Sequence, residues 1–75
     1  MKLSELKVGR RAKIVEVKGK GILRDRLLDM GLIPRTVVMV RKRAPLGDPI
    51  EITLRGYELT IRLQEASQIE VEEEV

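Results

Sequence analysis

Few residues of this chain could act directly on a substrate. Its 75 residues include no His and no Cys, which removes the commonest general base, the best nucleophile, and the usual ligands of zinc and iron–sulfur clusters. The hydroxyl groups of Ser4 and Ser67 have no recognisable base to activate them. The sequence therefore predicts a protein that is not an enzyme and that needs no cofactor.

Two groups of carboxylates remain as candidate ligands for a hard cation. Asp25 and Asp29 are four residues apart and would share one side of a helix, and residues 72–75 form a short acidic tail. Exposed sites made only of oxygen ligands hold divalent ions weakly. Arg24 and Arg26 can pair with the two aspartates, and an acidic tail is typically solvated. We therefore expect no metal site in this chain.

The charge of the chain is unevenly distributed. Residues 1–64 hold all fifteen Lys and Arg against seven acids, giving +8, whereas residues 65–75 hold five Glu and no base, giving −5 and a net charge of +3. A basic body with an acidic tail is typical of a solvated surface, and equally of a face that docks on an acidic or phosphorylated partner. These two interpretations stay open at this point.

Nucleic-acid binding is the alternative that the basic residues suggest. They are spread along the chain, and Tyr57 is the only aromatic residue. We expect Tyr57 to lie in the core, which would leave no aromatic platform on which bases could stack. The sequence therefore does not favour a nucleic-acid partner, and an RNA-binding or general peptide-binding module is kept as the second hypothesis.

A β-hairpin is the clearest element that the sequence predicts. Apolar and polar residues alternate over residues 50–54 and again over residues 57–61. A two-residue turn at Arg55-Gly56 would set Leu54 opposite Tyr57, Ile52 opposite Leu59 and Ile50 opposite Ile61. A slip of one residue would set apolar side chains against polar ones, so this register is well specified.

The remaining segments predict three more strands and a helix. Residues 3–6 resemble one helical turn with Ser4 as its N-cap, and strands are expected over residues 12–18, 36–44 and 68–72. A bulge is expected at Ile14-Val15, where two apolar residues interrupt the alternation. Residues 22–30 predict a helix with one apolar face, which Gly31 ends, and residues 45–49 predict a five-residue turn.

These elements predict an all-β fold with one short helix. Five short strands in one domain of residues 1–75 suggest a small, closed antiparallel barrel, with the helix inserted after the first strand. No apolar run approaches the ~20 residues of a membrane span, and the first residues lack the apolar segment of a signal peptide.

Three motifs carry a resemblance to a known family. They are R-D-R-L-L-D-M-G-L-I-P at residues 24–34, A-P-L-G-D-P-I-E-I at residues 44–52 and R-G-Y-E-L at residues 55–59. Together they resemble the FeoA family, small bacterial proteins associated with ferrous iron uptake. The usual family pattern has Gly directly after the first motif, where this chain has Arg35.

The resemblance implies both a fold and a role. The fold would be an SH3-like barrel with a helix in its first long loop. The role would be that of a non-catalytic, cytoplasmic accessory protein of ferrous iron transport, with transition-metal binding implied only for the family as a whole. The implied partner is the membrane ferrous iron transporter with a cytosolic GTPase domain, which would recruit the protein to the inner membrane without direct insertion. A homo-oligomer is left open.

Two surfaces are candidates for protein binding. Leu46 is expected to be exposed at the tip of the turn over residues 45–49, with Arg43 beside it. An apolar anchor with Arg at its rim is typical of a binding hot spot. Arg24 and Arg26 would flank the buried face of the helix and form the second candidate.

Overall fold

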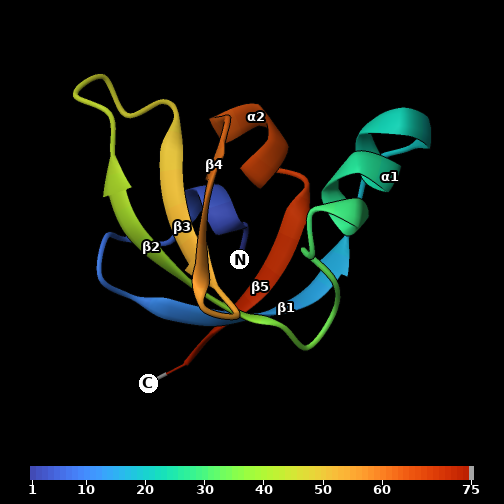
Figure 1. Cartoon of the computed structure of the whole chain (residues 1–75), viewed down its shortest axis with the longest axis horizontal. Helices are drawn as coiled ribbons and strands as arrows, with labels where there is room; N and C mark the ends of the chain where they lie inside the picture. Colours follow the sequence, from blue (N-terminus) through green and yellow to red (C-terminus); the bar gives the residue numbers. More distant parts are fainter. Residues whose placement is uncertain (75) are drawn as a thin grey trace.

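The computed structural model describes residues 1–74 as a curved antiparallel sheet with short helices at its margins (Figure 1). In chain order the elements are η1 (Leu3–Glu5), β1 (Arg11–Val17), α1 (Gly21–Asp29), β2 (Val37–Arg43), β3 (Ile50–Leu54), β4 (Tyr57–Ile61), α2 (Leu63–Ala66) and β5 (Ile69–Glu74). Adjacent strands follow the order β4-β3-β2-β1-β5. None of the described helices is long and apolar enough to cross a bilayer.

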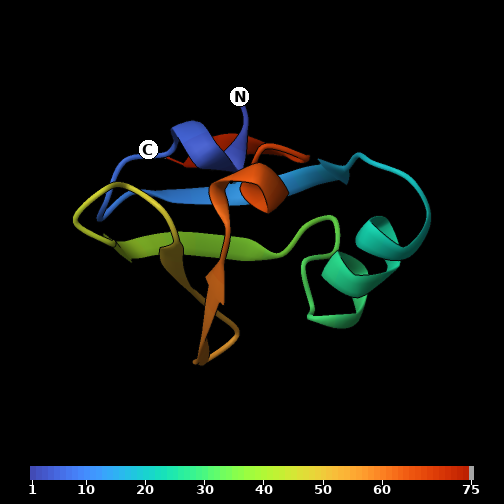
Figure 2. The same ribbon diagram turned by 90° about the horizontal axis from the view of Figure 1, so that it is seen from above.

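The core is built entirely from aliphatic side chains. Strong curvature of the sheet, which sets β4 across the direction of β1 in Figure 2, wraps one face of every strand around this core. Leu3 and Leu6, in and just after η1, are fully buried in this core. The other buried apolar residues are Ala12, Ile14, Val17, Leu27, Leu32, Val38, Val40, Ile50, Ile52, Leu54, Ile61, Ala66, Ile69 and Val71.

The predicted antiparallel barrel is confirmed, but hydrogen bonds between strands do not complete it. No ladder joins β4 to β5 within residues 1–74. The chain crosses from one of these strands to the other through α2, which packs against η1. The gap between β4 and β5 is therefore covered by the short helices and not closed by a fifth ladder.

The β3–β4 hairpin has the predicted register at all five positions, from Leu54↔Tyr57 to Ile50↔Ile61. Its turn is Arg55-Gly56, with φ values of +49° and +84°, as a type I′ turn requires. The prediction that Tyr57 lies in the core is wrong. Its side chain is 42% exposed, and its hydroxyl group donates a hydrogen bond to the carbonyl oxygen of Met30 at 2.5 Å.

The connection between β2 and β3 differs from the prediction. Arg43 pairs with Ile50, so the loop has six residues, 44–49, and not five. The pairing shifts between Val40 and Lys42, and this bulge at Arg41 changes which residues face inward. Because of the bulge, an even loop length still leaves Val40 and Ile50 both buried.

The N-terminal half of the chain follows the prediction with small changes. The expected bulge in β1 is confirmed, since its pairing with β5 shifts between Ile14 and Glu16. The cap of η1 is Lys2 and not Ser4: the Lys2 amide donates to Glu5 Oε1 at 2.7 Å. Helix α1 buries Leu27 completely, and Gly31 follows it with a φ of +96°.

The segment expected to be an acidic tail belongs to the sheet. Strand β5 continues to Glu74, with Glu72 opposite Lys13 and Glu74 opposite Arg11 on β1. Glu73 Oε2 also lies 3.5 Å from Arg10 Nε. The acidic segment is thus part of the sheet, where it lies beside basic residues of the neighbouring strand.

Arg35 occupies a backbone conformation that favours glycine. Its φ is +76°, in the left-handed region that side chains with a Cβ rarely adopt. The position is held by a hydrogen bond from the Arg35 amide to the Ile14 carbonyl oxygen at 2.7 Å. The position at which the family pattern has Gly is therefore one whose backbone conformation favours glycine, although this chain has Arg35 there.

Candidate protein-binding surface

The loop over residues 44–49 projects from one end of the sheet and exposes Leu46. The Leu46 side chain is 96% exposed, as the sequence predicted. Two backbone hydrogen bonds hold the loop: the Ala44 amide donates to the Pro49 carbonyl oxygen at 3.0 Å, and the Gly47 amide donates to the Ala44 carbonyl oxygen at 2.7 Å. Leu46 is therefore presented to solvent by an ordered turn.

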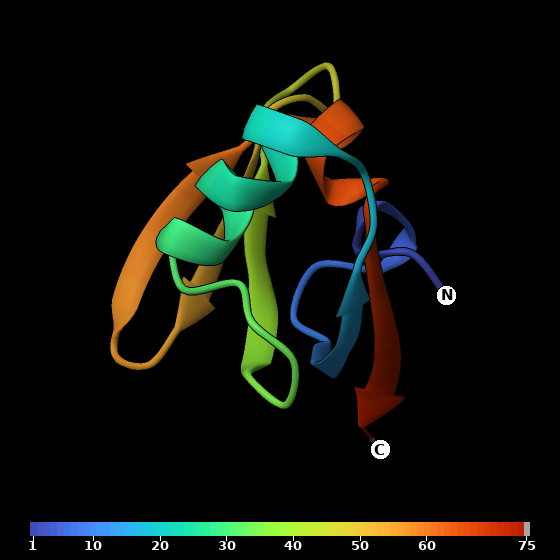
Figure 3. The ribbon, with the colours of Figure 1, turned by 90° about the vertical axis from the view of Figure 1, so that its right-hand side faces the viewer.

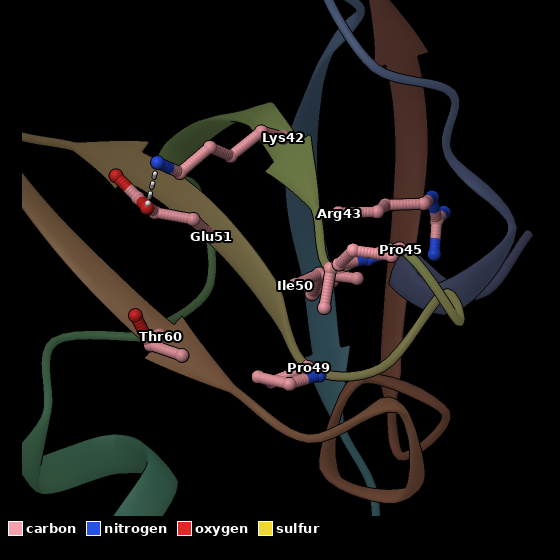
Figure 4. A pocket seen from close by; sticks show the side chains of 8 residues that line it. Lys42, Arg43, Pro45, Pro49, Ile50, Glu51 and Thr60 are labelled. Atoms are coloured by element: carbon pink, nitrogen blue, oxygen red, sulfur yellow. Dashed lines mark ion pairs between the residues drawn. The ribbon is translucent and has the colours of Figure 1, made fainter.

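A hollow of about 350 Å³ lies beside this loop, against the sheet (Figure 4). Pro45 and Pro49 provide apolar surface there, and Lys42 and Glu51 form an ion pair at its rim with a separation of 3.5 Å. The complete lining is Lys42, Arg43, Ala44, Pro45, Pro49, Ile50, Glu51 and Thr60. An exposed leucine next to an apolar hollow with a charged rim is a suitable surface for a protein partner.

Charges on β2, β3 and β4 are coupled at this rim. Arg41 contacts Glu51 at 3.8 Å and also pairs with Glu58. The adjacent Glu58 side chain, followed by the positive charges of Lys42 and Arg41, holds the pKa of Glu51 below the ordinary glutamate value, despite the opposing effect of desolvation. Glu51 is therefore ionised at neutral pH and can pair with Lys42.

Arg43 does not stand at the rim as a free cation. Its Nη2 donates to the carbonyl oxygens of Ser4, at 3.0 Å, and Leu6, at 2.7 Å. In Figure 4 its side chain runs away from Lys42, toward the N-terminal segment. Arg43 thus satisfies carbonyl groups around η1 and anchors that turn to the sheet, a role that the sequence pattern did not reveal.

The second predicted surface lies at the other end of the molecule. Arg24 and Arg26 are exposed on α1, and Arg26 Nη2 lies 3.9 Å from Glu65 Oε2 on α2. Figures 1 and 2 show α1 and the β2–β3 loop at opposite ends of the long axis. The structure therefore brings Arg43 near Leu46 but does not unite them with Arg24 and Arg26.

Sequence reasoning missed two features of these surfaces. Ile22, in the first turn of α1, is 79% exposed. The sequence carried a signal for this exposure, because Ile22 lies one residue before Leu23 and therefore outside the apolar face of the helix. Lys42, Glu51 and Thr60 line the hollow although they are distant in sequence. The pairing of Glu51 with Thr60 belongs to the predicted hairpin register and is confirmed. What was missed is the position of Lys42 opposite Glu51, which depends on the bulge at Arg41 in the β2–β3 register.

The candidate cation ligands do not form a site in the described part of the chain. Asp25 and Asp29 are exposed on α1, and residues 1–74 contain no cluster of three carboxylate, histidine or cysteine side chains able to hold a metal ion. Glu72 and Glu74 instead lie opposite Lys13 and Arg11. These two glutamates are therefore neighbours of basic residues within the sheet.

The chain is similar in sequence to proteins of ferrous iron transport. The FeoA domain model matches residues 1–73. A fusion protein from Porphyromonas gingivalis, which joins Fe(2+) transport protein A to the Fe(2+) transporter FeoB, is 42% identical over 72 residues, or 96% of this chain. This chain spans only 8% of that relative's length.

Solved structures share the whole architecture. A FeoA-like protein from Clostridium acetobutylicum has a TM-score of 0.93 and 33% identity, covering 100% of this chain and 87% of that one. FeoA of Stenotrophomonas maltophilia, described in complex with zinc as a prokaryotic SH3 domain protein, has a TM-score of 0.85 and 24% identity, covering 96% and 89% of the two chains. At that identity the second likeness concerns the fold alone, and it confirms the expected SH3-like barrel. By its family model and by these relatives, the chain belongs to the FeoA family.

Proposed function

We propose that this protein is a non-catalytic accessory protein of bacterial ferrous iron uptake, which acts by binding the membrane transporter with a cytosolic GTPase domain. The fusion in P. gingivalis carries this proposal, because a segment closely similar to this chain is covalently joined there to the transporter FeoB. Joining two modules in one chain replaces a bimolecular encounter with a local one at high effective concentration. In this protein, the same contact would form between two separate chains, the accessory protein and the transporter.

The β2–β3 loop is the surface that we assign to this contact. Leu46 is almost fully exposed beside the apolar hollow, and binding sites concentrate on loops held by a rigid scaffold. Lys42, whose side chain is 69% exposed, replaces Arg43 as the cation at the rim. Arg24 and Arg26 on α1 form the competing surface.

The location of the protein follows from this partner. A domain of residues 1–75 that binds the cytosolic part of a transporter would itself be cytoplasmic, and would reach the inner membrane only through that contact. Catalysis remains with the transporter, since this chain lacks His and Cys for nucleophilic or acid–base chemistry.

The experiment compares two exposed apolar residues at opposite ends of the molecule. Leu46→Ser and Ile22→Ser are each measured by surface plasmon resonance against the purified cytosolic region of the transporter, with circular dichroism as the folding control. We expect Leu46→Ser to weaken binding about tenfold or more, mainly through a faster off-rate, as for loss of a hot-spot anchor. Ile22→Ser should bind like the parent.

Three outcomes would count against the proposal in different ways. Weakening by Ile22→Ser alone, or by Arg24→Glu with Arg26→Glu, would move the interface to α1. Equal binding of both serine variants would exclude Leu46 as an anchor. Failure of the parent to bind at all would overturn the accessory role itself.

The proposed role leaves iron as cargo of the transporter and not of this protein. Anaerobic calorimetric titration with Fe²⁺ should show no site tighter than about 10 μM, as for exposed oxygen-only ligands. Tight stoichiometric binding would show instead that the protein delivers the ion.

A further inference from the structure

Strand β4 leaves backbone hydrogen-bonding groups unpaired at the edge of the sheet. Leu54 and Tyr57 close a two-residue turn, so they must exchange hydrogen bonds with each other, and the pairs then alternate along the ladder. Tyr57, Leu59 and Ile61 therefore direct their amide and carbonyl groups to β3. The same groups of Glu58 and Thr60 point outward, and no backbone partner for them occurs in residues 1–74.

At the opposite edge of the sheet, the outward backbone groups of β5 have hydrogen-bonding partners. Along the outer side of β5, the Val71 amide donates to the Met1 carbonyl oxygen at 2.7 Å, and Lys2 forms an antiparallel bridge with Glu70. Residues 1–2 thus occupy the edge of β5. Figure 3 shows β4 at the outer margin of the sheet, facing the left of that view, with no strand beyond it.

Exposed edge strands are templates for pairing with another chain, and proteins usually protect them with a charge turned inward, a proline or a bulge. None of these protections occurs in β4: its register is regular over all five residues, and its inward-facing residues are Tyr57, Leu59 and Ile61. Tyr57 is 42% exposed and Leu59 is only partly buried. An added strand would cover both.

We infer that β4 pairs antiparallel with β4 of a second copy of this protein, about a two-fold axis at Leu59. This register places Glu58 opposite Thr60 of the other copy, and Thr60 opposite Glu58. Both residues carry outward backbone groups, so each pair can exchange two hydrogen bonds. Leu59 then faces its own copy across the axis, and Tyr57 faces Ile61.

The choice of a second copy rests on the self-complementarity of this strand. On the outer face, a charged residue meets a neutral hydroxyl group, so no like charges lie directly opposite each other. Glu58 is also already neutralised by Arg41 within its own chain. On the inner face, all pairs are apolar. A two-fold interface requires a patch to be complementary to itself, and β4 fulfils this requirement over its whole length.

Neighbouring registers are less suitable. An axis at Glu58 would set two glutamates opposite each other, which is unfavourable. An axis at Thr60 would require the amide of Arg62, which already donates to Glu65 Oε1 at 2.8 Å and caps α2. The register about Leu59 is the one that uses only groups still free.

The test uses the protein alone and one proline. Thr60→Pro removes the outward amide but no hydrogen bond to β3, and proline is tolerated at strand edges. The matched control, Thr60→Val, keeps the amide. By sedimentation equilibrium up to about 1 mM protein, we expect monomer–dimer equilibrium for the parent and for Thr60→Val, and at least tenfold weaker association for Thr60→Pro.

A second measurement needs no variant. Amide exchange by NMR should slow at Glu58 and Thr60 as the parent concentration rises, while the inward amides of Leu59 and Ile61 stay protected throughout. A parent that is monomeric at the highest concentration would overturn the inference, as would undiminished dimerisation of Thr60→Pro. Protection of these two amides only after addition of the transporter's cytosolic region would do the same, since a foreign strand would then occupy the edge.

Discussion

Strand β3 enters and leaves the sheet through two turns of opposite character. At one end, Arg55 Nη2 donates to Thr36 Oγ1 at 3.0 Å and the Tyr57 hydroxyl group donates to the Met30 carbonyl oxygen, so the two-residue turn is tied to the residue before β2 and to the residue after α1. At the other end, residues 44–49 carry Leu46 into solvent beside a hollow. The β3–β4 turn is therefore fixed to the rest of the domain by side-chain hydrogen bonds, whereas the β2–β3 loop leaves an apolar side chain accessible to a partner.

The largest expected effect concerns the rigid hairpin. Ile52 is fully buried and pairs with Leu59, so Ile52→Ala should lower the free energy of unfolding by roughly 2–5 kcal/mol. Thr53→Ala, on the opposite face of the same strand, should be nearly neutral. Urea denaturation of the two variants measures the difference, and equal losses would show that the two faces of β3 are wrongly assigned.

The next effect distinguishes anchoring from exposure at the loop. Arg43→Ala removes two hydrogen bonds to carbonyl groups of η1 and should cost about 1–3 kcal/mol, as expected for a charged donor. The adjacent Lys42→Ala removes only a surface ion pair with Glu51 and should cost less than about 0.5 kcal/mol. Thermal denaturation provides the comparison; similar losses would mean that the Arg43 contacts carry no stability.

A smaller effect, of opposite sign, is expected at Arg35. Because its φ is +76°, Arg35→Gly should stabilise the protein by about 1 kcal/mol through release of backbone strain, less the entropy that glycine adds to the unfolded chain. A higher urea midpoint would confirm the effect. A lower midpoint would mean that the arginine side chain offsets the strain.

The smallest effect is a dependence on pH at the rim of the hollow. The pKa of Glu51 is lowered in the folded protein, so its contribution to stability is present above the pKa of an unfolded-chain glutamate, about 4.3, and disappears as the pH falls through the folded-state pKa. Glu51→Gln should therefore be less stable than the parent near neutral pH, and the two should converge in acid. Denaturation midpoints from pH 7 to pH 3 test this, and a constant difference would exclude the ionised carboxylate as its cause.

The two ends of β3 also differ in how far the sequence predicted them. The hairpin register followed from alternation alone, because a two-residue turn leaves only one pairing in which Ile52 meets an apolar partner. The β2–β3 register was not predictable in the same way, since a bulge at Arg41 changes the parity of the strand without changing its composition. Only the pairing of distant backbone groups reveals it.

Side-chain roles at the candidate surface were harder to predict than the surface itself. The exposure of Leu46 followed from its place in a turn between two prolines. The anchoring role of Arg43 depends on η1, more than thirty residues away in the chain, and no local pattern encodes that proximity. Tyr57 was assigned to the core by its position in the alternation, whereas β4 lies at an edge, where inward-facing residues are only partly covered.

The contrast between the fixed turn and the free loop can be tested in one measurement. The isotope-labelled protein is titrated with the unlabelled cytosolic region of the transporter, and amide shifts are followed by NMR. We predict that the largest changes fall within residues 42–51, around Leu46, while Arg55, Gly56 and the residues of α1 change little. Shifts concentrated on Ile22, Arg24 and Arg26 would contradict the assignment of the loop as the binding surface.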